Sequence, residues 1–242
     1  MKQEINFKDL GVVDYQSAWD YQESLLKENV RIKSLAFGYE TAADAAPAAS
    51  ETKHYFLFVE HPPVYTLGKS GDMANVLIDE EVRTKKGIEF FKTNRGGDIT
   101  FHGPGQVVGY PIIDLEKYYT DIGKYLRNIE EVIILTLADY GIVAGRSPGE
   151  TGVWLDAEIK GKERKICAIG VRTSRWITMH GFALNVNTDL NYFNFIVPCG
   201  ISDKQVTSLQ KELGREVDME EVKERIKNNF EKIFDASFVD SN

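Results

Sequence analysis

Helical segments in this chain alternate with groups of consecutive strands, and that order limits the folds open to it. Capped amphipathic helices are predicted from Asp14 to about residue 33, from Asp121 to a stop at Gly141, and over 218–234, with a shorter helix within 202–213. Apolar runs rich in β-branched and aromatic residues predict strands at 55–59, 64–67, 88–92, 107–114, 151–155, 165–173 and 176–187. The order predicts an α+β fold of α/β type, a mixed sheet with helices packed against it.

The chain of 242 residues is long enough for one large core, and it contains no repeat and no second apolar core. We therefore expect a single domain over 1–242. Residues 41–52 (TAADAAPAASET) hold few large apolar groups and one proline, which predicts a flexible loop. The polar end of the chain, 236–242, predicts a tail.

Composition excludes several classes of protein. Hydrophobic residues make up 43% of the chain and charged residues 27%, which is ordinary for a globular protein. No apolar run reaches the roughly 20 residues of a membrane span, and the first residues lack the apolar core of a signal peptide. We expect a cytoplasmic protein with no membrane contact. A net charge of −8 argues against a nucleic-acid partner.

One segment opposes the acidic character of the chain. Residues 158–175 hold six basic and two acidic residues, a local balance of +4. A basic patch on an acidic protein can steer an acidic partner toward it. A solvated hairpin with no partner explains the charge equally well.

The chain has two cysteines, and their surroundings differ. Cys199 lies between Pro198 and Gly200, residues that favour a turn, so its thiol is expected to be accessible for chemistry. Cys167 lies within an apolar strand and is interpreted as a core residue. Strict alternation along that strand puts Lys165, Cys167, Ile169 and Val171 on one face, unless a bulge, for which Gly170 is a candidate, breaks the count.

Residues 94–106 (NRGGDITFHGPGQ) contain four glycines within ten positions. Such a segment lets backbone N–H groups approach a ligand, with Arg95, Thr100 and His102 as polar groups around it. No Gly-Lys-Ser/Thr sequence follows, so it is not a P-loop, and the glycine spacing misses the dinucleotide-binding motif by one residue. A tight hairpin that needs glycine for its backbone geometry is the alternative.

Several motifs in the same order resemble those of the octanoyl (lipoyl) transferases, the acyl-carrier-protein:protein octanoyltransferases of lipoate biosynthesis. They are 60–68 (EHPPVYTLG), 95–106 (RGGDITFHGPGQ), 165–172 (KICAIGVR), 180–186 (HGFALNV) and 198–201 (PCGI). The resemblance extends from about residue 55 to residue 209. Two departures are a cysteine at 167, where a small residue such as alanine is expected, and the inserted loop at 41–52.

The resemblance implies a fold similar to the catalytic domains of biotin and lipoate ligases. It also implies transfer of an octanoyl group from octanoyl-acyl carrier protein to a lysine of lipoyl domains, such as those of 2-oxoacid dehydrogenase complexes and the glycine cleavage H protein. No cofactor, metal or nucleotide would be required. Cys199 would be the acylated nucleophile and Lys165 the residue that lowers its pKa. The substrate site implied by the resemblance consists of Arg95, Gly96, Gly97, Asp98, Ile99, Thr100, Phe101, His102, Ala168, Ile169, Gly170, His180, Gly181, Phe182 and Ala183.

General chemistry also supports a pair of Cys199 and Lys165, apart from the resemblance. A thiol with a pKa of about 8.5 is only a few per cent ionised at neutral pH, and the thiolate is the form that attacks a thioester. A nearby Lys165 ammonium would favour the thiolate by roughly one to three pKa units. We expect Lys165 to lose its proton after Cys199 is acylated and then to act as general base for the incoming amine.

Other readings of these residues stay open. His102 and His180 are rival bases, although orienting substrate or bracing a turn suits them as well. A His, His, Cys metal site with Cys199 is a further alternative, although no two of its members have metal-site spacing. An ATP-dependent lipoate or biotin ligase, or a non-catalytic protein that binds an acyl carrier, would also account for a similar fold.

Overall fold

The computed structural model describes residues 2–36, 51–197 and 205–240. The strands are β1 (Gln3–Val12), β2 (His54–Glu60), β3 (Val64–Leu67), β4 (Glu89–Lys92), β5 (Ile99–His102), β6 (Gln106–Ile112), β7 (Val153–Leu155), β8 (Arg164–Ser174), β9 (Ile177–Asn185), β10 (Gln205–Val206) and β11 (Ala236–Asp240). The α-helices are α1 (Tyr15–Ala36), α2 (Glu80–Lys85), α3 (Ile122–Ala138), α4 (Leu209–Leu213) and α5 (Met219–Phe234). Short 3₁₀ helices are η2 (Met73–Asn75), η3 (Leu115–Lys117) and η4 (Leu190–Phe195).

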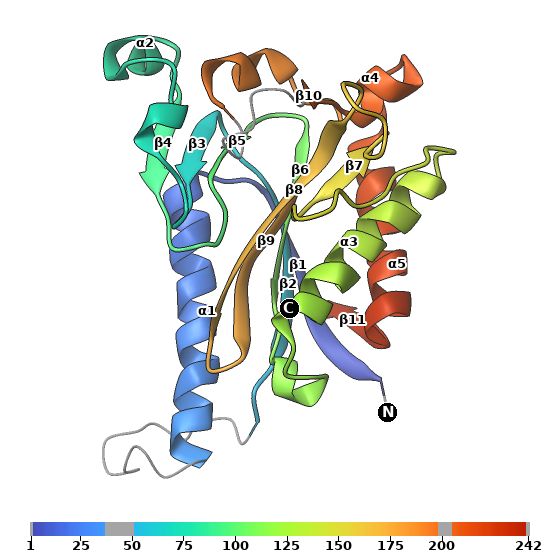
Figure 1. Ribbon diagram of the computed structural model, residues 1–242. Coiled ribbons are helices and arrows are strands. Elements are labelled where there is room, and N and C mark those ends of the chain that lie inside the picture. Colours follow the sequence, from blue (N-terminus) through green and yellow to red (C-terminus); the bar gives the residue numbers. More distant parts are fainter. Residues whose placement is uncertain (1, 37–50, 198–204, 241–242) are drawn as a thin grey trace.

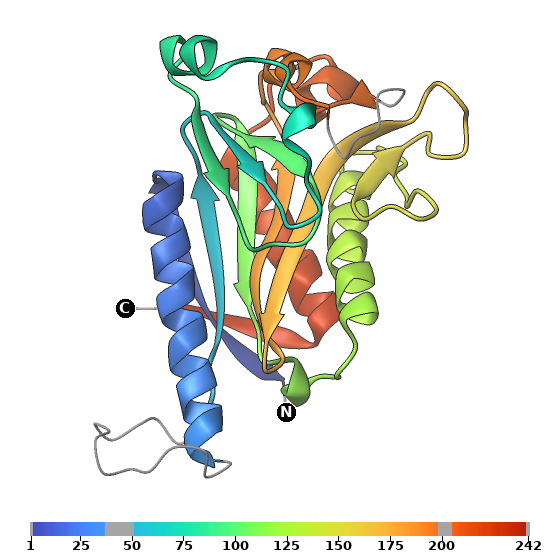
Figure 2. The same cartoon turned by 60° about the vertical axis from the view of Figure 1, so that its left-hand side comes forward.

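A mixed sheet of eight strands forms the centre of the molecule, in the order β10-β8-β9-β6-β2-β1-β11, with β7 also paired to β8. Helix α1 lies on one side of this sheet and helices α3 and α5 lie on the other (Figures 1 and 2). A smaller sheet, β4-β3-β5, lies on the same side as α1. The expected mixed sheet packed by helices is therefore confirmed.

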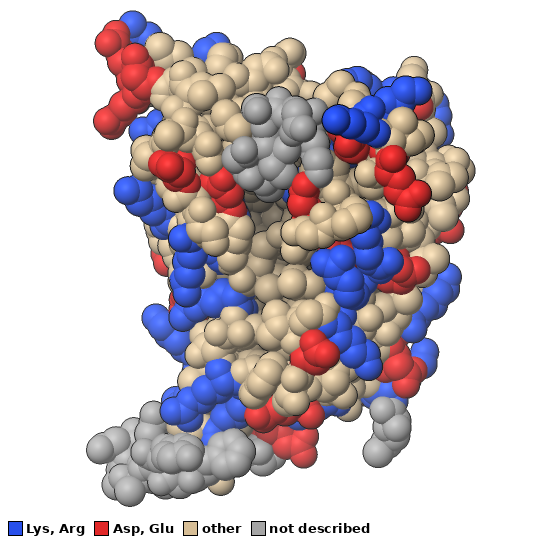
Figure 3. Space-filling model, viewed as in Figure 1, with Lys and Arg blue, Asp and Glu red and all other residues tan. Residues whose placement is uncertain are grey.

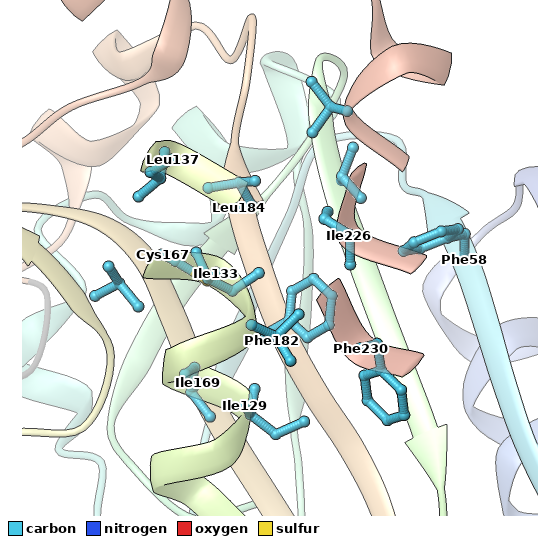
Figure 4. Close-up of a cluster of buried hydrophobic side chains, with 14 of the residues drawn as sticks. Phe58, Ile129, Ile133, Leu137, Cys167, Ile169, Phe182, Leu184, Ile226 and Phe230 are labelled. Carbon is cyan, nitrogen blue, oxygen red and sulfur yellow. The ribbon is translucent and has the colours of Figure 1, made fainter. Parts of the chain in front are cut away.

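Both faces of the large sheet are apolar because its central strands are covered twice. Phe56 and Phe58 of β2 pack in the cluster under α3 and α5, while Leu57 and Val59 pack on the side of α1. Figure 4 shows Phe58 in the first cluster with side chains from α3 and α5. This period of two explains why β2 reads as a continuous apolar run in the sequence.

Capping residues begin the long helices where the sequence predicts them. Asp14 accepts a hydrogen bond from the N–H of Ser17, Asp121 from Lys124 and Asp218 from Glu220. Each carboxylate satisfies a backbone donor that the first turn of a helix leaves open. The three predicted helix starts are confirmed.

The buried face of α1 is not made of apolar residues alone. Polar side chains occupy much of it, among them Gln22, Asn29 and Lys33. The Asn29 amide, for example, donates to the carbonyl of Lys53 and accepts from its N–H. Apolar periodicity does not reveal this face, because several of its buried side chains are polar and are hydrogen-bonded to partners.

Both ends of the chain contain strands that the sequence did not predict. Residues 236–240 form β11, which pairs in parallel with β1, so the expected tail at 236–242 is wrong over those residues. β1 in turn pairs with β2. These strands were missed because β1 has one buried residue, Ile5, and β11 has only five residues.

Two other expectations, next to the segments 37–50 and 198–204 that the structure does not describe, need correction. Within the predicted helix at 202–213, residues 205–206 form strand β10 and α4 begins only at Leu209, with Ser208 as its cap. Residues 41–50 of the predicted loop lie outside the described residues. Its last residue, Thr52, is buried and donates from its hydroxyl to Asp114 at 2.7 Å, so the loop ends before it.

A buried ion pair ties the end of α1 to the large sheet. The Lys33 ammonium donates to Asp114 at 2.5 Å, to Glu116 at 2.8 Å and to the carbonyl of Arg175 at 2.9 Å. Side chains of Lys33 and Asp114 are only 7% and 4% exposed. Breaking one partner of such a pair leaves an uncompensated buried charge.

We predict that Lys33→Met lowers the free energy of unfolding by about 3–5 kcal/mol, because Asp114 then stays buried without its cation. Urea unfolding, compared at an unchanged slope, measures this loss. Lys85→Met is the matched control, since its partner Glu81 and Lys85 itself are more than 70% exposed, and it should cost no more than about 0.5 kcal/mol. Equal urea midpoints for the two variants would contradict the prediction.

No helix within 2–36, 51–197 and 205–240 has both the length and the apolar content that crossing a bilayer demands.

Candidate active site

A cavity of about 460 Å³ is lined by residues of the small sheet and of β8 and β9. Figure 3 shows a hollow in this region, with basic side chains on both of its flanks. Most of the residues implied by the resemblance line it: Arg95, Gly97, Asp98, Ile99, Thr100, His102, Lys165, Ala168, Ile169, Gly170, His180, Gly181, Phe182 and Ala183. Segments far apart in the sequence are thus brought to one pocket.

Two of the implied residues do not line the cavity. The N–H of Gly96 donates to the carbonyl of Val171, which ties the glycine-rich segment to β8. Phe101 is buried in the core of the small sheet, where its ring stacks on Tyr192 with centroids 4.6 Å apart. Both residues support the segment that carries their neighbours.

Residues outside the implied set also line the pocket. Tyr15 comes from α1, Val108 and Tyr110 from β6, and Glu150 and Thr151 from the loop before β7. Tyr15 follows the helix cap and Val108 and Tyr110 belong to an apolar run, so each reads as a core residue in the sequence. Their position is set by pairing between distant strands.

A bulge in β8 turns Lys165 toward the pocket. One step along β7, from Val153 to Trp154, corresponds to two steps along β8, from Cys167 to Lys165, so Ile166 is the extra residue. Both Ile166 and Cys167 consequently pack in the core under α3, whereas Lys165 lines the cavity. The strict alternation that would have put Lys165 beside Cys167 is wrong, and the bulge lies at Ile166 rather than at Gly170.

The Lys165 side chain is buried, with 8% of its surface exposed, and its ammonium lies over the ring of Trp154, 4.6 Å from the centroid. A Cβ on Gly152 would lie 3.2 Å from Lys165 Cε and 2.6 Å from the carbonyl oxygen of Cys167. Glycine at 152, with φ of 126°, therefore lets the backbone pass directly against the lysine. The aromatic face and this backbone confine the cation at the pocket wall.

The interpretation of Cys167 as a core residue is confirmed. Its side chain is completely buried among the apolar groups shown in Figure 4. Burial raises the pKa of its thiol far above the ordinary value. This thiol therefore remains protonated and is no nucleophile at neutral pH.

Cys199 lies outside the described residues, as do Pro198, Gly200 and Ile201. The described residues next to this segment are Val197 and Gln205. Before the gap, the N–H of Val197 donates to the carbonyl of Asn75 at 2.8 Å. After it, Val206 lines the cavity and pairs in parallel with Lys165.

Arg95 holds the glycine-rich segment together. Its guanidinium donates to the carbonyls of Thr66 at 2.6 Å, Asp98 at 2.8 Å and Gly96 at 3.0 Å. A Cβ on Gly170 would lie 2.8 Å from the carbonyl oxygen of Gly96, so the segment approaches β8 only because glycine stands there. Arg95 was expected as a polar group for a ligand, and its guanidinium also supports the fold by joining its own loop to Thr66 of β3.

His102 has a partner at each ring nitrogen. The Gln106 amide donates to Asn185 and to the carbonyl of Phe101, so its oxygen accepts from His102 Nδ1–H at 2.9 Å. His102 Nε2 then accepts from the Thr66 hydroxyl at 3.3 Å. Burial lowers the pKa of His102 well below its usual range. The ring is a neutral brace in this arrangement.

His180 is held from α1. Its Nε2–H donates to Asn94 at 2.7 Å, and its backbone N–H donates to the Gln22 side chain at 3.0 Å. A φ of 59° places it in the left-handed region, which is strained for a residue with a side chain. Burial, helped by the positive charge of Arg95, lowers the pKa of His180 to about 3. The imidazole is therefore neutral and a weak base.

The basic segment carries less free charge than its residue count suggests. Arg164 pairs with Asp156 and Glu212, and Arg172 pairs with Glu23. Lys165 is buried in the pocket. The balance of +4 over 158–175 therefore overstates the positive surface available to a partner.

Among the described residues, no group of three or more histidine, cysteine, aspartate or glutamate side chains is arranged to hold a metal ion. The metal site considered from the sequence included Cys199, which the structure does not describe.

The chain matches a known family over most of its length. The family model for the lipoyl protein ligase A/B catalytic domain matches residues 14–231. An octanoyltransferase of Christiangramia forsetii is 56% identical over 239 residues, 98% of each chain. An octanoyltransferase of Flavobacterium psychrophilum is 57% identical over 240 residues, 99% of this chain and 100% of the relative. The chain therefore belongs to the lipoyl protein ligase A/B catalytic domain family, and its relatives at 56–57% identity are octanoyltransferases.

Solved structures share the fold at low sequence identity. A bi-partite lipoate protein ligase from Thermoplasma acidophilum matches with a TM-score of 0.67 and 18% identity, covering 99% of this chain and 87% of that one. A lipoate-protein ligase A bound with ATP matches with a TM-score of 0.65 and 17% identity, covering 100% and 89%. The expected likeness to lipoate ligase catalytic domains is confirmed for the fold.

We predict that acid destabilises the protein between about pH 6.5 and pH 4. Burial lowers the pKa of His54 and His61 to about 4 and that of His180 to about 3, and it lowers the pKa of His102 well below its usual range. Because these folded-state values lie below the ordinary value near 6.5, the unfolded chain binds more protons as the pH falls through this range. Each such histidine lowers the free energy of unfolding by roughly 1.4 kcal/mol for every pH unit within this range.

Urea unfolding from pH 8 to pH 4 measures this slope. Stability should be flat above pH 7 and fall steeply below 6.5. His54→Gln is the informative variant, because His54 does not line the cavity. Its loss should reduce the slope of stability against pH by the contribution of about one proton. A constant urea midpoint between pH 7 and pH 4.5 would contradict the four buried neutral imidazoles.

Proposed function

We propose that this protein transfers an octanoyl group from octanoyl-acyl carrier protein to a lysine of a lipoyl domain, through a thioester on Cys199. The observation that carries the proposal is the buried Lys165 ammonium in the wall of a mostly apolar cavity, which Val206 also lines. Identity of 56–57% to octanoyltransferases over nearly the whole chain supports the same activity.

The cavity suits an alkyl chain. Val108, Ile169, Phe182 and Ala183 contribute apolar surface to it, and Gly170 and Gly181 keep part of the sheet face free of side chains. Each buried methylene contributes about 0.8 kcal/mol. That value discriminates only about fourfold between chains that differ by one carbon, so the rejection of longer chains requires a closed end to the cavity.

The first step is attack of the Cys199 thiolate on the donor thioester. A bond forms between its sulfur and the carbonyl carbon, the bond from that carbon to the carrier sulfur breaks, and the carrier leaves as a thiolate that takes up a proton. A lysine held in a buried pocket favours the thiolate form of a nearby cysteine. The donor is already activated, so the step needs no ATP.

The second step forms the amide. The acceptor amine attacks the thioester carbon, the bond to Cys199 sulfur breaks, and the proton of the amine passes to Lys165. Lys165 can accept it because acylation removes the thiolate that favoured its ammonium form, so that Lys165 first gives its own proton to the departing carrier thiolate and is neutral when the amine attacks. The geometry of the two histidines favours this assignment, since His102 has partners at both nitrogens and His180 is a weak base.

The rival activity is that of an ATP-dependent ligase. One structural neighbour is a lipoate-protein ligase A bound with ATP, but at 17% identity it supports the fold alone. The solved archaeal ligase is described with its E2 lipoyl domain, but at 18% identity it too supports the fold alone. A ligase would activate a free acid as an acyl-adenylate, whereas the proposed enzyme becomes acylated directly.

We predict that incubation with octanoyl-acyl carrier protein, without ATP, adds one octanoyl group to the protein at Cys199. Intact mass and peptide mass measure the adduct and its position. Cys199→Ala should abolish it, and Cys167→Ala should not, because Cys167 is buried in the core. An unmodified parent protein, or an adduct retained in Cys199→Ala, would remove the proposed thioester.

We predict that Lys165→Arg separates the two steps. Arginine keeps the positive charge but does not deprotonate, so acylation of Cys199 should persist while transfer to the lipoyl domain falls at least about 100-fold. Single-turnover assays starting from the isolated acyl-enzyme measure the second step alone. Transfer at close to the parent rate would show that another group is the base.

A further inference from the structure

Two walls confine the Lys165 ammonium, and both belong to the segment that leads into β7. The Trp154 ring lies 4.6 Å from the lysine nitrogen, and the backbone at Gly152 passes close to its Cε atom. Pairing of β7 with β8 positions the backbone of Trp154, whereas Gly152 belongs to an irregular segment that has a second glycine at 149. Contacts with α3 also hold both walls in place.

Trp154 is held by a reciprocal backbone pair. Its N–H donates to the carbonyl of Gly145 at 2.9 Å, and the N–H of Gly145 donates back at 2.8 Å. The residue after Gly145 is Arg146, whose guanidinium donates to Glu130 on α3 at 2.9 Å. The position of the indole therefore depends on how α3 holds Arg146.

Gly152 is held by the same carboxylate. Its N–H donates to Glu130 Oε1 at 3.0 Å, while Glu130 Oε2 accepts from Arg146 and pairs with Arg127 at 2.7 Å. The side chain of Glu130 is completely buried. A buried carboxylate is costly unless it is fully paired, and here three donors satisfy it.

We propose that Glu130 is a positioning residue that fixes the Lys165 ammonium at the pocket wall by anchoring both Gly152 and the Gly145–Arg146 strip that holds Trp154. It does not line the cavity, so it acts on the reaction only through Lys165. The inference rests on the proposed function, because it assigns a purpose to the exact placement of that lysine.

The effect is mainly geometric. Arg127 and Arg146 flank Glu130, and Arg146 also pairs with Glu131, so the cluster is close to neutral. Little net charge from it reaches Lys165. Lys165 requires that its two walls, Trp154 and the backbone at Gly152, be attached rigidly to α3, which packs in the core.

Glu130→Gln tests this because a carboxylate accepts on both oxygens and an amide does not. Every contact of Glu130 is with a donor, so the amide NH₂ must face either Gly152 or the guanidinium groups, and one attachment is lost. Glu131→Gln is the matched control. Glu131 is the next residue on α3 and contacts Arg146, but no bond joins it to Gly152 within the described chain.

The measurement is the pH dependence of the rate at which iodoacetamide alkylates Cys199, with the site identified by peptide mass. In the proposed dyad, Lys165→Met gives the reference shift of the profile toward the ordinary thiol value. Glu130→Gln should shift the midpoint upward by about one pH unit, and Glu131→Gln should leave it in place. In the Lys165→Met background, Glu130→Gln should cause no further shift.

The outcomes separate the two proposals. If Lys165→Met shifts the profile and Glu130→Gln does not, the positioning role is wrong and the dyad stands. If Lys165→Met leaves the profile unchanged, the dyad fails and the positioning role fails with it. A shift by Glu130→Gln that persists in the Lys165→Met background also overturns the inference, since Glu130 would then act on Cys199 by another route.

A milder variant covers the case in which Glu130→Gln does not fold. Arg146→Lys keeps the charge, and its side chain is 35% exposed, but it loses the Nε–H contact to Glu130. A smaller upward shift of the alkylation profile is expected. An unchanged profile in folded Arg146→Lys would overturn the role of the Gly145–Arg146 strip.

Discussion

A single extra residue in β8 decides where the most important cation of the molecule lies. Without the bulge at Ile166, Lys165 would share a face with Cys167 and point into the apolar core. Burying an unpaired ammonium there would be prohibitively costly. With the bulge, the core receives Ile166 and Cys167 while the lysine enters the cavity beside β10. Register in this one strand thus links the stability of the fold to the chemistry of the pocket.

The rest of the pocket is built from polar groups that satisfy one another. Arg95 is paired with loop carbonyls, His102 with Gln106 and Thr66, and His180 with Asn94. Such pairing keeps the imidazoles neutral and holds the glycine-rich segment above the sheet. The Lys165 ammonium lies beside these groups, over the ring of Trp154, and its Cε atom is close to the backbone at Gly152. This buried amine is the reason for centring the proposed reaction on Lys165.

The sequence predicted the parts of this structure that depend on local physics. Aspartates at helix starts, apolar runs in central strands and a buried Cys167 follow from capping, period and composition, and the structure confirms them. The glycine-rich segment and the Lys165 strand were correctly expected to meet in one site region, but that expectation came from the resemblance. Composition alone would not have joined them.

The features that the sequence did not predict depend on contacts between distant segments. Gln22 and Asn29 are buried in α1 because partners more than 20 residues away satisfy them. The edge pair of β1 and β11 joins the two ends of the chain. The bulge at Ile166 is defined only by pairing with β7, which no local pattern in β8 reveals. Each of these needs knowledge of a partner that periodicity does not supply.

A crystal structure of the resting enzyme that resolves residues 198–204 tests the account most directly, through the distance from Cys199 Sγ to Lys165 Nζ. The account predicts that the two atoms lie within about 4–6 Å, the range over which an ammonium favours a thiolate. A well-ordered Cys199 that points away from the cavity, with Lys165 still over Trp154, would contradict it.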